Sequence, residues 1–86
     1  MKPVTIYTRA FCPYCVRALA LIHKKGVEYT EIKAGMNAEK KREMIARSKG
    51  GQTFPQIFVG DEHIGGCDEM MALERTGALD VLLHSA

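Results

Sequence analysis

Several features that would assign the chain to a class of protein are scarce in it or missing. Its 86 residues contain no tryptophan and only 7% aromatic residues, so the sequence lacks the interleaved aromatic and basic side chains that bind single-stranded nucleic acid. No apolar run reaches 18 residues, so we expect no membrane-spanning helix. The chain also lacks a strong excess of either charge, because 12 basic and 10 acidic side chains leave a net charge of +2. The composition therefore gives no reason to expect a nucleic-acid or membrane partner.

Cysteine is scarce as well. The three cysteines are an odd number, which argues against the fully paired framework of a small secreted protein. They suit a reducing compartment better, where such residues are usually catalytic or bind metal. The apolar stretch at the N-terminus is interrupted by Arg9 before it could form a signal-peptide core. We therefore expect a cytoplasmic protein.

The remaining composition is that of an ordinary globular chain. Hydrophobic residues make up 47% and charged residues 26% of the sequence, which is typical of a folded protein rather than a disordered one. A chain of this length is too short for two hydrophobic cores but long enough to fold without disulfides. We expect residues 1–86 to form a single domain.

The feature that organises the sequence is Cys12-Pro13-Tyr14-Cys15, which follows a strand-like stretch, Val4-Thr5-Ile6-Tyr7, and begins a helical one. A Cys-x-x-Cys pair alone can be half of a zinc site. At the start of a helix, however, unpaired N–H groups and the positive end of the helix dipole favour a thiolate at Cys12. Pro13 suits the first helical position, because its φ is already helical and it has no N–H to leave unpaired.

The two sulfur atoms of this motif should not be equivalent. Cys15 lies on the same stripe of the following helix as Leu19 and Ile22, and that stripe faces the sheet. Cys12 precedes the first turn and should stay open to solvent. We therefore expect Cys12 to be the attacking thiol and Cys15 the shielded one. A stabilised thiolate is also a better leaving group, so this arrangement should speed the turnover of a mixed disulfide at Cys12.

Hydrophobic periodicity divides the chain into short strands and helices. Strands are predicted at residues 4–8, 27–32, 56–59 and 63–64, and helices at 13–25, 38–48, 68–76 and around Leu79, Leu82 and Leu83. Asn37 is placed to cap the second helix, and Gly26 and Gly77 to end the first and the third. The first strand, helix and strand imply a right-handed parallel unit. The order β-α-β-α-β-β-α-α predicts an α/β, thioredoxin-like fold, with a four-stranded mixed sheet flanked by helices.

The first two helices differ in character. The first is apolar nearly all round, so we expect it to pack closely on the sheet. The second is highly charged, with Met44 and Ile45 as its expected core contacts and with Glu43 and Arg47 at the spacing of a stabilising pair. Its lysines are explained better by a solvated helical face than by a nucleic-acid site.

Along its whole length the chain resembles a dithiol glutaredoxin with a Cys-Pro-Tyr-Cys motif. The resemblance rests on four segments in the right order and spacing: Ile6-Tyr7-Thr8-Arg9, Cys12-Pro13-Tyr14-Cys15, Thr53-Phe54-Pro55-Gln56-Ile57-Phe58 and Ile64-Gly65-Gly66-Cys67-Asp68-Glu69. It implies glutathione-dependent exchange with protein disulfides or glutathionylated proteins. Glutathione would be a co-substrate, no cofactor would be tightly bound, and the protein would act as a monomer.

The resemblance also implies roles for individual residues. Cys12 would be the nucleophile and Cys15 the resolving thiol. Pro55 would be a cis proline, and the backbone of Phe54 would pair with the cysteinyl part of glutathione. Phe54 departs from the valine that is usual in the family, and its ring could narrow access for protein substrates. The implied glutathione-binding residues are Arg9, Tyr14, Thr53, Phe54, Pro55, Gly66, Cys67 and Asp68.

Some of these roles have plain structural alternatives. Arg9 would meet the glycine carboxylate of glutathione, helped by Gln52 or Lys49, or would be an exposed charge that only favours the thiolate. The segment 65–68 would hold the γ-glutamyl end, with Asp68 accepting the ammonium group or serving as a helix N-cap. Cys67 would be a buried, inert thiol or a site of glutathionylation under oxidation.

Two alternatives from other classes are weaker. A zinc module could use Cys12, Cys15, His63 and Cys67, but the last two do not form the short ligand pair that structural zinc sites carry. An iron–sulfur carrier could hold a cluster through the first cysteine and glutathione, but relatives of that type usually lack the second cysteine and its tyrosine. A thioredoxin proper would carry a tryptophan beside the dithiol. We expect no metal site.

Overall fold

The computed structural model describes residues 2–84, which form one mixed sheet with helices on both faces. The strands lie in the order β2-β1-β3-β4, with β1 at Val4–Thr8, β2 at Tyr29–Lys33, β3 at Gln56–Val59 and β4 at Glu62–Gly65. Strand β1 runs parallel to β2 and antiparallel to β3, and β3 is antiparallel to β4. The parallel unit at the start of the chain and the mixed sheet are as the sequence predicts.

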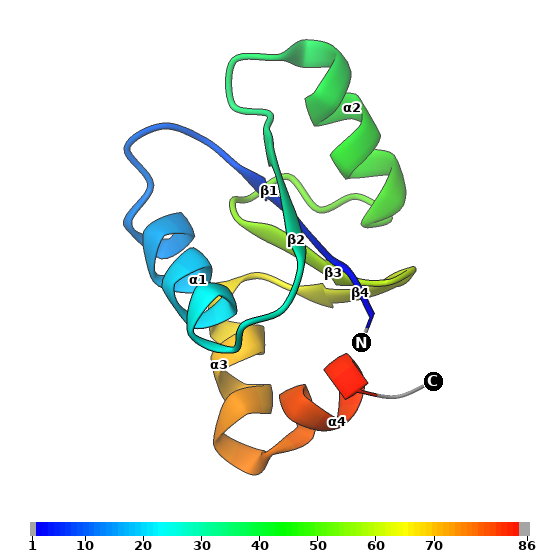
Figure 1. The fold of residues 1–86 in the computed structure, drawn as a ribbon. Coiled ribbons are helices and arrows are strands. Elements are labelled where there is room, and N and C mark those ends of the chain that lie inside the picture. The colour runs from blue at the N-terminus through cyan, green and yellow to red at the C-terminus, as the bar shows by residue number, and fades with distance from the viewer. Residues whose placement is uncertain (1, 85–86) are drawn as a thin grey trace.

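The helices lie in two layers (Figure 1). They are α1 at Pro13–Lys24, α2 at Ala38–Arg47, α3 at Cys67–Thr76 and α4 at Ala78–His84. Helix α2 covers one face of the sheet, and α1, α3 and α4 lie on the other (Figure 1). The observed order of elements is the predicted one, and it brings the turn before α1, the segment before β3 and the start of α3 to the same region of the molecule.

Each face of the sheet has its own hydrophobic core. The larger one joins the sheet to α1, α3 and α4 and contains Val4, Ile6, Ala18, Ile22, Val27, Ile57, Val59, Cys67, Met70, Leu79 and Leu83. The smaller one lies under α2 and contains Tyr7, Ala34, Met44 and Phe58, with Ile45 and Phe54 packed against it. The prediction that Met44 and Ile45 contact the core is confirmed. The alternation of side chains along β1 and β3 supplies both cores, because neighbouring residues point to opposite faces.

Local signals in the sequence fix several helix ends. The Oδ1 of Asn37 accepts the backbone N–H of Lys40 at 3.0 Å and so caps α2. Gly26 follows α1 with a φ of +69°, and Gly77 ends α3 with a φ of +81°, both in the left-handed region that glycine adopts without strain. These three predictions are confirmed.

One expected boundary is wrong. Strand β2 begins at Tyr29 rather than at residue 27, because Val27 turns into the larger core before the pairing with β1 starts. Helix α1 packs on the sheet as predicted: Cys15, Ala18 and Ile22 are its buried residues, and Val16 on the other side is 66% exposed. The helix is covered on its sheet-facing stripe alone.

The predicted pair on α2 takes a different form. The hydroxyl of Tyr7, which is fully buried, donates to Glu43 Oε2 at 2.6 Å and accepts from Arg47 Nη1 at 3.0 Å. The ion pair that Glu43 makes is with Lys40, at 3.6 Å. The two charged side chains therefore meet at a tyrosine from β1, which the sequence spacing alone could not show.

The ends of the described chain lie side by side, away from the turn between β1 and α1 (Figure 1). The N–H of Lys2 donates to the carbonyl of Leu83 at 2.9 Å.

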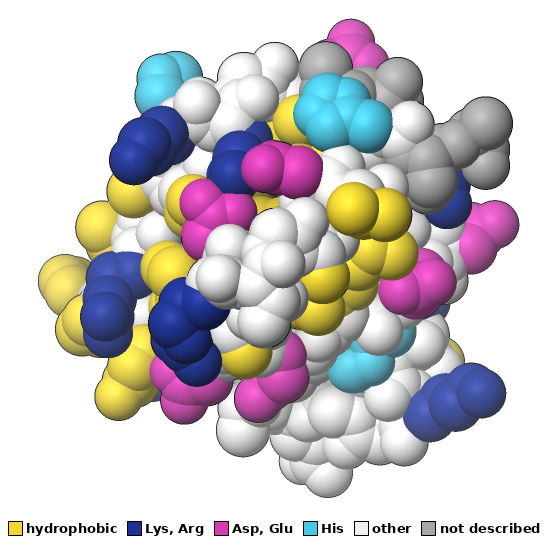
Figure 2. All heavy atoms as spheres, turned by 90° about the horizontal axis from the view of Figure 1, so that it is seen from below, with side chains coloured by type: hydrophobic (Ala, Val, Ile, Leu, Met, Phe, Trp, Pro, Cys, Tyr) yellow, Lys and Arg dark blue, Asp and Glu magenta, His cyan; other side chains and the backbone are white. Residues whose placement is uncertain are grey.

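On the side of α3 and α4, Figure 2 shows acidic and basic side chains next to one another beside an apolar patch. Lys25 pairs there with Glu74 at 2.7 Å and Asp80 at 2.9 Å. Across residues 2–84, none of the helices has the length and apolar character needed to cross a membrane.

Candidate active site

The centre of the site is the sulfur of Cys12 at the start of α1. Cys12 is the N-cap residue of the helix, with an extended backbone, and its Sγ accepts the N–H of Cys15 at 3.2 Å. On its other side, Sγ lies 3.8 Å from the carbonyl oxygen of Phe54. An N-capping sulfur that accepts a helix N–H is held in the field that stabilises negative charge. The sulfur of Cys12 therefore lies at the positive end of the α1 dipole.

The expectation that Cys12 stays open to solvent is wrong. Only 4% of its surface is exposed, against 3% for Cys15. The cause is a long-range contact, since Phe54, 42 residues farther along the chain, places its carbonyl beside the sulfur. Cys12 and Cys15 nevertheless both line a cleft at the surface, so the two thiols differ in hydrogen bonding more than in exposed area.

Burial affects the second thiol strongly. Burial and, after it, the hydrogen bond with Cys12 together raise the pKa of Cys15 from 9.0 to about 12. Cys15 therefore keeps its proton at neutral pH. A protonated thiol beside the first sulfur can resolve a disulfide only after it gives up that proton, which suits a second step better than a first one.

A cleft of about 210 Å³ lies beside the dithiol, between the segment before β3 and the start of α3. We call it the proline cleft; its lining consists of Tyr14, Thr53, Phe54, Pro55, Gly66, Cys67, Asp68 and Glu69. The peptide bond between Phe54 and Pro55 is cis. The structure thus brings together every residue that the resemblance implied for glutathione except Arg9.

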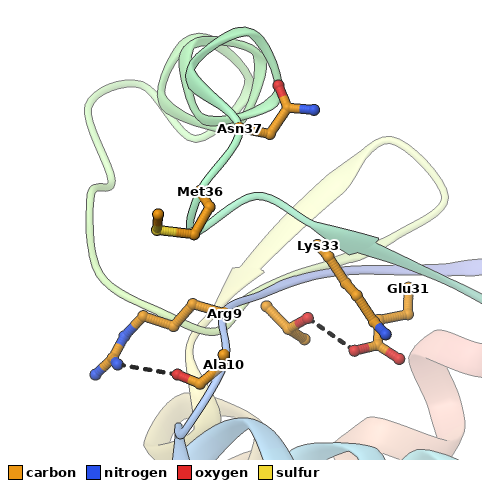
Figure 3. Close-up of a pocket in the computed structure, with 8 residues that line it drawn as sticks. Arg9, Ala10, Glu31, Lys33, Met36 and Asn37 are labelled. Carbon is orange, nitrogen blue, oxygen red and sulfur yellow. Dashed lines mark hydrogen bonds between the residues drawn. The ribbon is translucent and has the colours of Figure 1, made fainter.

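Arg9 lies on the other side of Cys12, where two further clefts meet. The cysteine cleft, about 460 Å³, is lined by Thr8, Arg9, Phe11, Cys12, Pro13, Cys15, Val16, Leu19 and Glu31. The Met36 cleft, about 490 Å³, is lined by Thr8, Arg9, Ala10, Glu31, Lys33, Gly35, Met36 and Asn37 (Figure 3). The guanidinium of Arg9 donates to the carbonyl of Ala10 at 3.3 Å and is exposed. Its predicted contact with glutathione would need this side chain to turn.

The start of α3 differs in detail from the expectation. Gly66, not Asp68, is the N-cap, so the N-cap alternative for Asp68 is wrong, and Asp68 lies in the first turn. Glu69 takes over the capping, because its Oε1 accepts the N–H of Gly66 at 2.6 Å. Cys67 begins the helix and is buried, as its default interpretation requires, and burial raises the pKa of its thiol.

The sequence did not reveal the contacts that hold Thr53. Gln56 is buried, and its Nε2 donates to the carbonyl oxygen of Thr53 at 2.9 Å and to its Oγ1 at 3.1 Å. The Oε1 of the same amide lies 2.6 Å from Nε2 of His63 on β4. The available signal was the single polar residue in the apolar run Gln56-Ile57-Phe58-Val59, since a buried polar side chain needs partners.

Phe54 serves both the cleft and the core. Its side chain packs against the core under α2, while the residue as a whole lines the proline cleft.

The described part of the chain, residues 2–84, has no group of three or more histidine, cysteine or acidic side chains that could hold a metal ion.

Comparison with known proteins decides the family. The glutaredoxin family model matches residues 4–64. The chain belongs to the glutaredoxin family. It is 53% identical to glutaredoxin 3 of Escherichia coli (strain K12) over 83 residues, which cover 96% of this chain and 99% of that protein.

Solved structures agree with this assignment. The solution structure of a glutaredoxin from Brucella melitensis is similar with a TM-score of 0.82 and 54% identity, over 96% of this chain and 89% of that one. The crystal structure of a buckwheat glutaredoxin–glutathione complex has a TM-score of 0.83 and 31% identity, over 95% and 76% of the two chains. The fold is therefore thioredoxin-like, as predicted.

Membership in the family also settles the class of activity. Glutaredoxins are glutathione-dependent thiol–disulfide oxidoreductases, and glutathione is their substrate. The adjacent sulfurs of Cys12 and Cys15 at the start of α1 fit thiol–disulfide exchange. The predicted class of enzyme is confirmed.

Proposed function

We propose that the protein uses glutathione to reduce protein disulfides and glutathione mixed disulfides, with Cys12 as the nucleophile and Cys15 as the resolving thiol. The observation that carries this proposal is the N-capping position of Cys12, whose sulfur accepts the N–H of Cys15 at 3.2 Å. The high pKa of Cys15, about 12, keeps the second thiol protonated while the first one reacts.

The proline cleft is the proposed site of the glutathionyl group. The backbone of Phe54 would pair with its cysteinyl part, since the carbonyl of this residue already lies beside the reacting sulfur. The γ-glutamyl carboxylate would lie against first-turn N–H groups of α3, which have no partner within the helix. Asp68 would accept the ammonium group, and Tyr14 and Thr53 would border the ligand.

The chemistry proceeds by two exchanges. The Cys12 thiolate attacks the glutathione sulfur of a mixed disulfide, the S–S bond to the substrate breaks, and the substrate leaves as a thiolate that takes a proton from water. A glutathione thiolate then attacks the glutathione sulfur bound to Cys12, which releases oxidised glutathione and restores the Cys12 thiolate. With a protein disulfide, Cys12 attacks a protein sulfur, and Cys15 closes the Cys12–Cys15 disulfide, which two glutathione molecules reduce.

Arg9 is proposed to bind the glycine carboxylate after its exposed side chain turns from Ala10 toward the proline cleft. Gln52 and Lys49, both exposed, lie on the segment before Thr53 and are the candidate helpers. We further propose that the protein acts as a monomer in the cytoplasm, a compartment that suits its three free cysteines.

The test is glutathione-coupled reduction of a small glutathione mixed disulfide by the parent protein, Cys12→Ser and Cys15→Ser. Cys12→Ser should lose activity, whereas Cys15→Ser should keep it for the mixed disulfide and lose it for a protein disulfide that needs both thiols. Alkylation at pH 7 should label Cys12 before Cys15 in peptide mass spectra. Activity retained by Cys12→Ser would show that the assignment is wrong.

A further inference from the structure

Two of the most exposed apolar side chains of the described chain border the clefts that lie beyond Cys12 from the proline cleft. Phe11 is 98% exposed and directly precedes the reactive cysteine, and Met36 is 99% exposed. Phe11 also has a φ of +55°, in the left-handed region that a bulky residue rarely adopts. Core packing accounts for neither side chain, because both extend into solvent.

The cysteine cleft and the Met36 cleft adjoin each other. They share Thr8, Arg9 and Glu31, and we call the two together the trough, which extends from the dithiol, past Phe11, to Met36. Figure 3 shows the far part of it, with Met36 above Arg9 and with Lys33 and Glu31 together at the other end. If glutathione occupies the proline cleft, this trough is the surface left beside Cys12 for the rest of a mixed disulfide.

The chemistry of the trough changes along its length. Beside the dithiol it is apolar, with Phe11, Val16 and Leu19 in its lining. Farther out it carries two basic groups, Arg9 and Lys33, against one acidic group. The carboxylate of that acidic residue, Glu31, already accepts the hydroxyl of Thr8 at 2.8 Å. Arg9 is proposed to turn toward glutathione, so Lys33, which is exposed, is the basic group that remains in the far part of the trough.

We propose that this trough binds the protein part of a glutathionylated substrate, as an extended segment with an apolar residue next to the modified cysteine and an acidic residue farther along. The proposal rests on the proposed function and adds the substrate class that it prefers. Phe11 beside the dithiol and Met36 farther out would supply apolar contact along the segment, and a flexible thioether adapts to different side chains. Lys33 supplies the charge that selects acidic partners.

The test compares three substrates: a small glutathione mixed disulfide, a glutathionylated peptide with an apolar neighbour and acidic residues beyond it, and the same peptide with lysines in place of the acids. The variants are Phe11→Asn, which tolerates the left-handed backbone, Met36→Gln and Lys33→Glu. Val81→Gln is the matched control, because Val81 is an exposed apolar residue on α4, 70% exposed and outside every cleft named above.

Phe11→Asn and Met36→Gln should each lower kcat/KM for the acidic peptide by about fivefold, since they remove apolar contact made with the segment alone. Activity on the small disulfide should change by less than about twofold. Lys33→Glu should invert the preference between the acidic and the basic peptide. Val81→Gln should behave as the parent with all three substrates.

Other outcomes would overturn the proposal. If Phe11→Asn and Met36→Gln lost as much activity on the small disulfide as on the peptide, both residues would act in general catalysis. A higher KM for glutathione in these variants would make glutathione the occupant of the trough. Peptide activity unchanged from the Val81→Gln control would exclude docking there. A parent protein inactive on the small disulfide would instead remove the proposed function itself.

Discussion

The side-chain amide of Gln56 donates hydrogen bonds to both oxygens of Thr53, the carbonyl at 2.9 Å and the hydroxyl at 3.1 Å. Its own oxygen lies 2.6 Å from the ring nitrogen of His63. Because Gln56 is buried and Thr53 lines the proline cleft, one amide joins the β3–β4 hairpin to the wall of the proposed glutathione site.

Substitution of Gln56 by Leu should weaken substrate binding more than folding. Thr53 is exposed, so water can take up its oxygens, and the free energy of unfolding should fall by about 1 kcal/mol or less. The loosened segment should raise KM for a glutathione mixed disulfide by about fivefold, with a smaller change in kcat. Steady-state kinetics and urea unfolding separate the two effects.

His63→Gln is the milder change in the same chain of contacts, because glutamine retains a donor for Gln56. It should give a KM close to that of the parent. His84→Gln, at an exposed histidine on α4, is the control for loss of a histidine alone. If Gln56→Leu bound the mixed disulfide as well as His84→Gln does, the amide would have no part in shaping the cleft.

Stability should fall on the alkaline side. Burial raises the pKa of Cys15 from 9.0 to about 12, and it also raises the pKa values of Cys67 and Tyr7. The folded state therefore keeps thiol protons that the unfolded state releases above the ordinary thiol pKa of 9.0. The stability from this difference is fully present below that pH and is lost as pH rises toward 12. Unfolding by urea at pH 8 and pH 11 measures it.

The free energy of unfolding of Cys15→Ser should fall less steeply with rising pH than that of the parent, because serine does not titrate in this range. His23→Ser, at an exposed position of the same helix, should keep the parent slope. Equal slopes in parent and Cys15→Ser would mean that Cys15 titrates as freely in the folded protein as in the unfolded chain.

Tyr7→Phe should destabilise the protein at neutral pH by about 2 kcal/mol, since it removes a buried hydrogen bond to a charged group. The hydrogen bond from Tyr7 lowers the pKa of Glu43. A lowered carboxyl pKa gives stability that is present above the unfolded value, about 4.3, and is lost as pH falls below it.

The difference in free energy of unfolding between parent and Tyr7→Phe should therefore become smaller in acid. Chemical unfolding at pH 7 and pH 3.5 tests this. Tyr29→Phe, at a tyrosine 41% exposed on β2, should match the parent at both values. If the difference in free energy of unfolding between parent and Tyr7→Phe stayed constant with pH, the contribution of Tyr7 to stability would not depend on the charge of Glu43.

The features that the sequence predicts well depend on neighbours in the chain. Asn37 caps α2 through a group three residues away, and Gly77 ends α3 through its own backbone freedom. The four motifs place the dithiol and the segments beside it, so seven of the eight implied glutathione residues line one cleft. Spacing and residue type carry this information because it is local or shared with a known family.

The features that it misses depend on distant partners. Cys12 is buried because Phe54 lies against it, and Glu43 meets Arg47 through Tyr7 rather than directly. Arg9 lines the trough, together with Glu31 of β2, rather than the proline cleft. The exposure of Phe11 runs against the ordinary preference of phenylalanine for the interior, so composition could not indicate it.

Strand β2 is an outer strand of the sheet, and two of its five residues, Glu31 and Lys33, are charged and exposed. The opposite outer strand, β4, is short and begins with an exposed glutamate. Charged side chains on an open strand discourage backbone pairing between molecules. Apolar replacements at Glu31 and Lys33 would leave a Tyr-Thr-x-Ile-x ribbon with no charge, and such a chain should aggregate. The same lysine that is proposed to select acidic partners thus also keeps the protein dispersed.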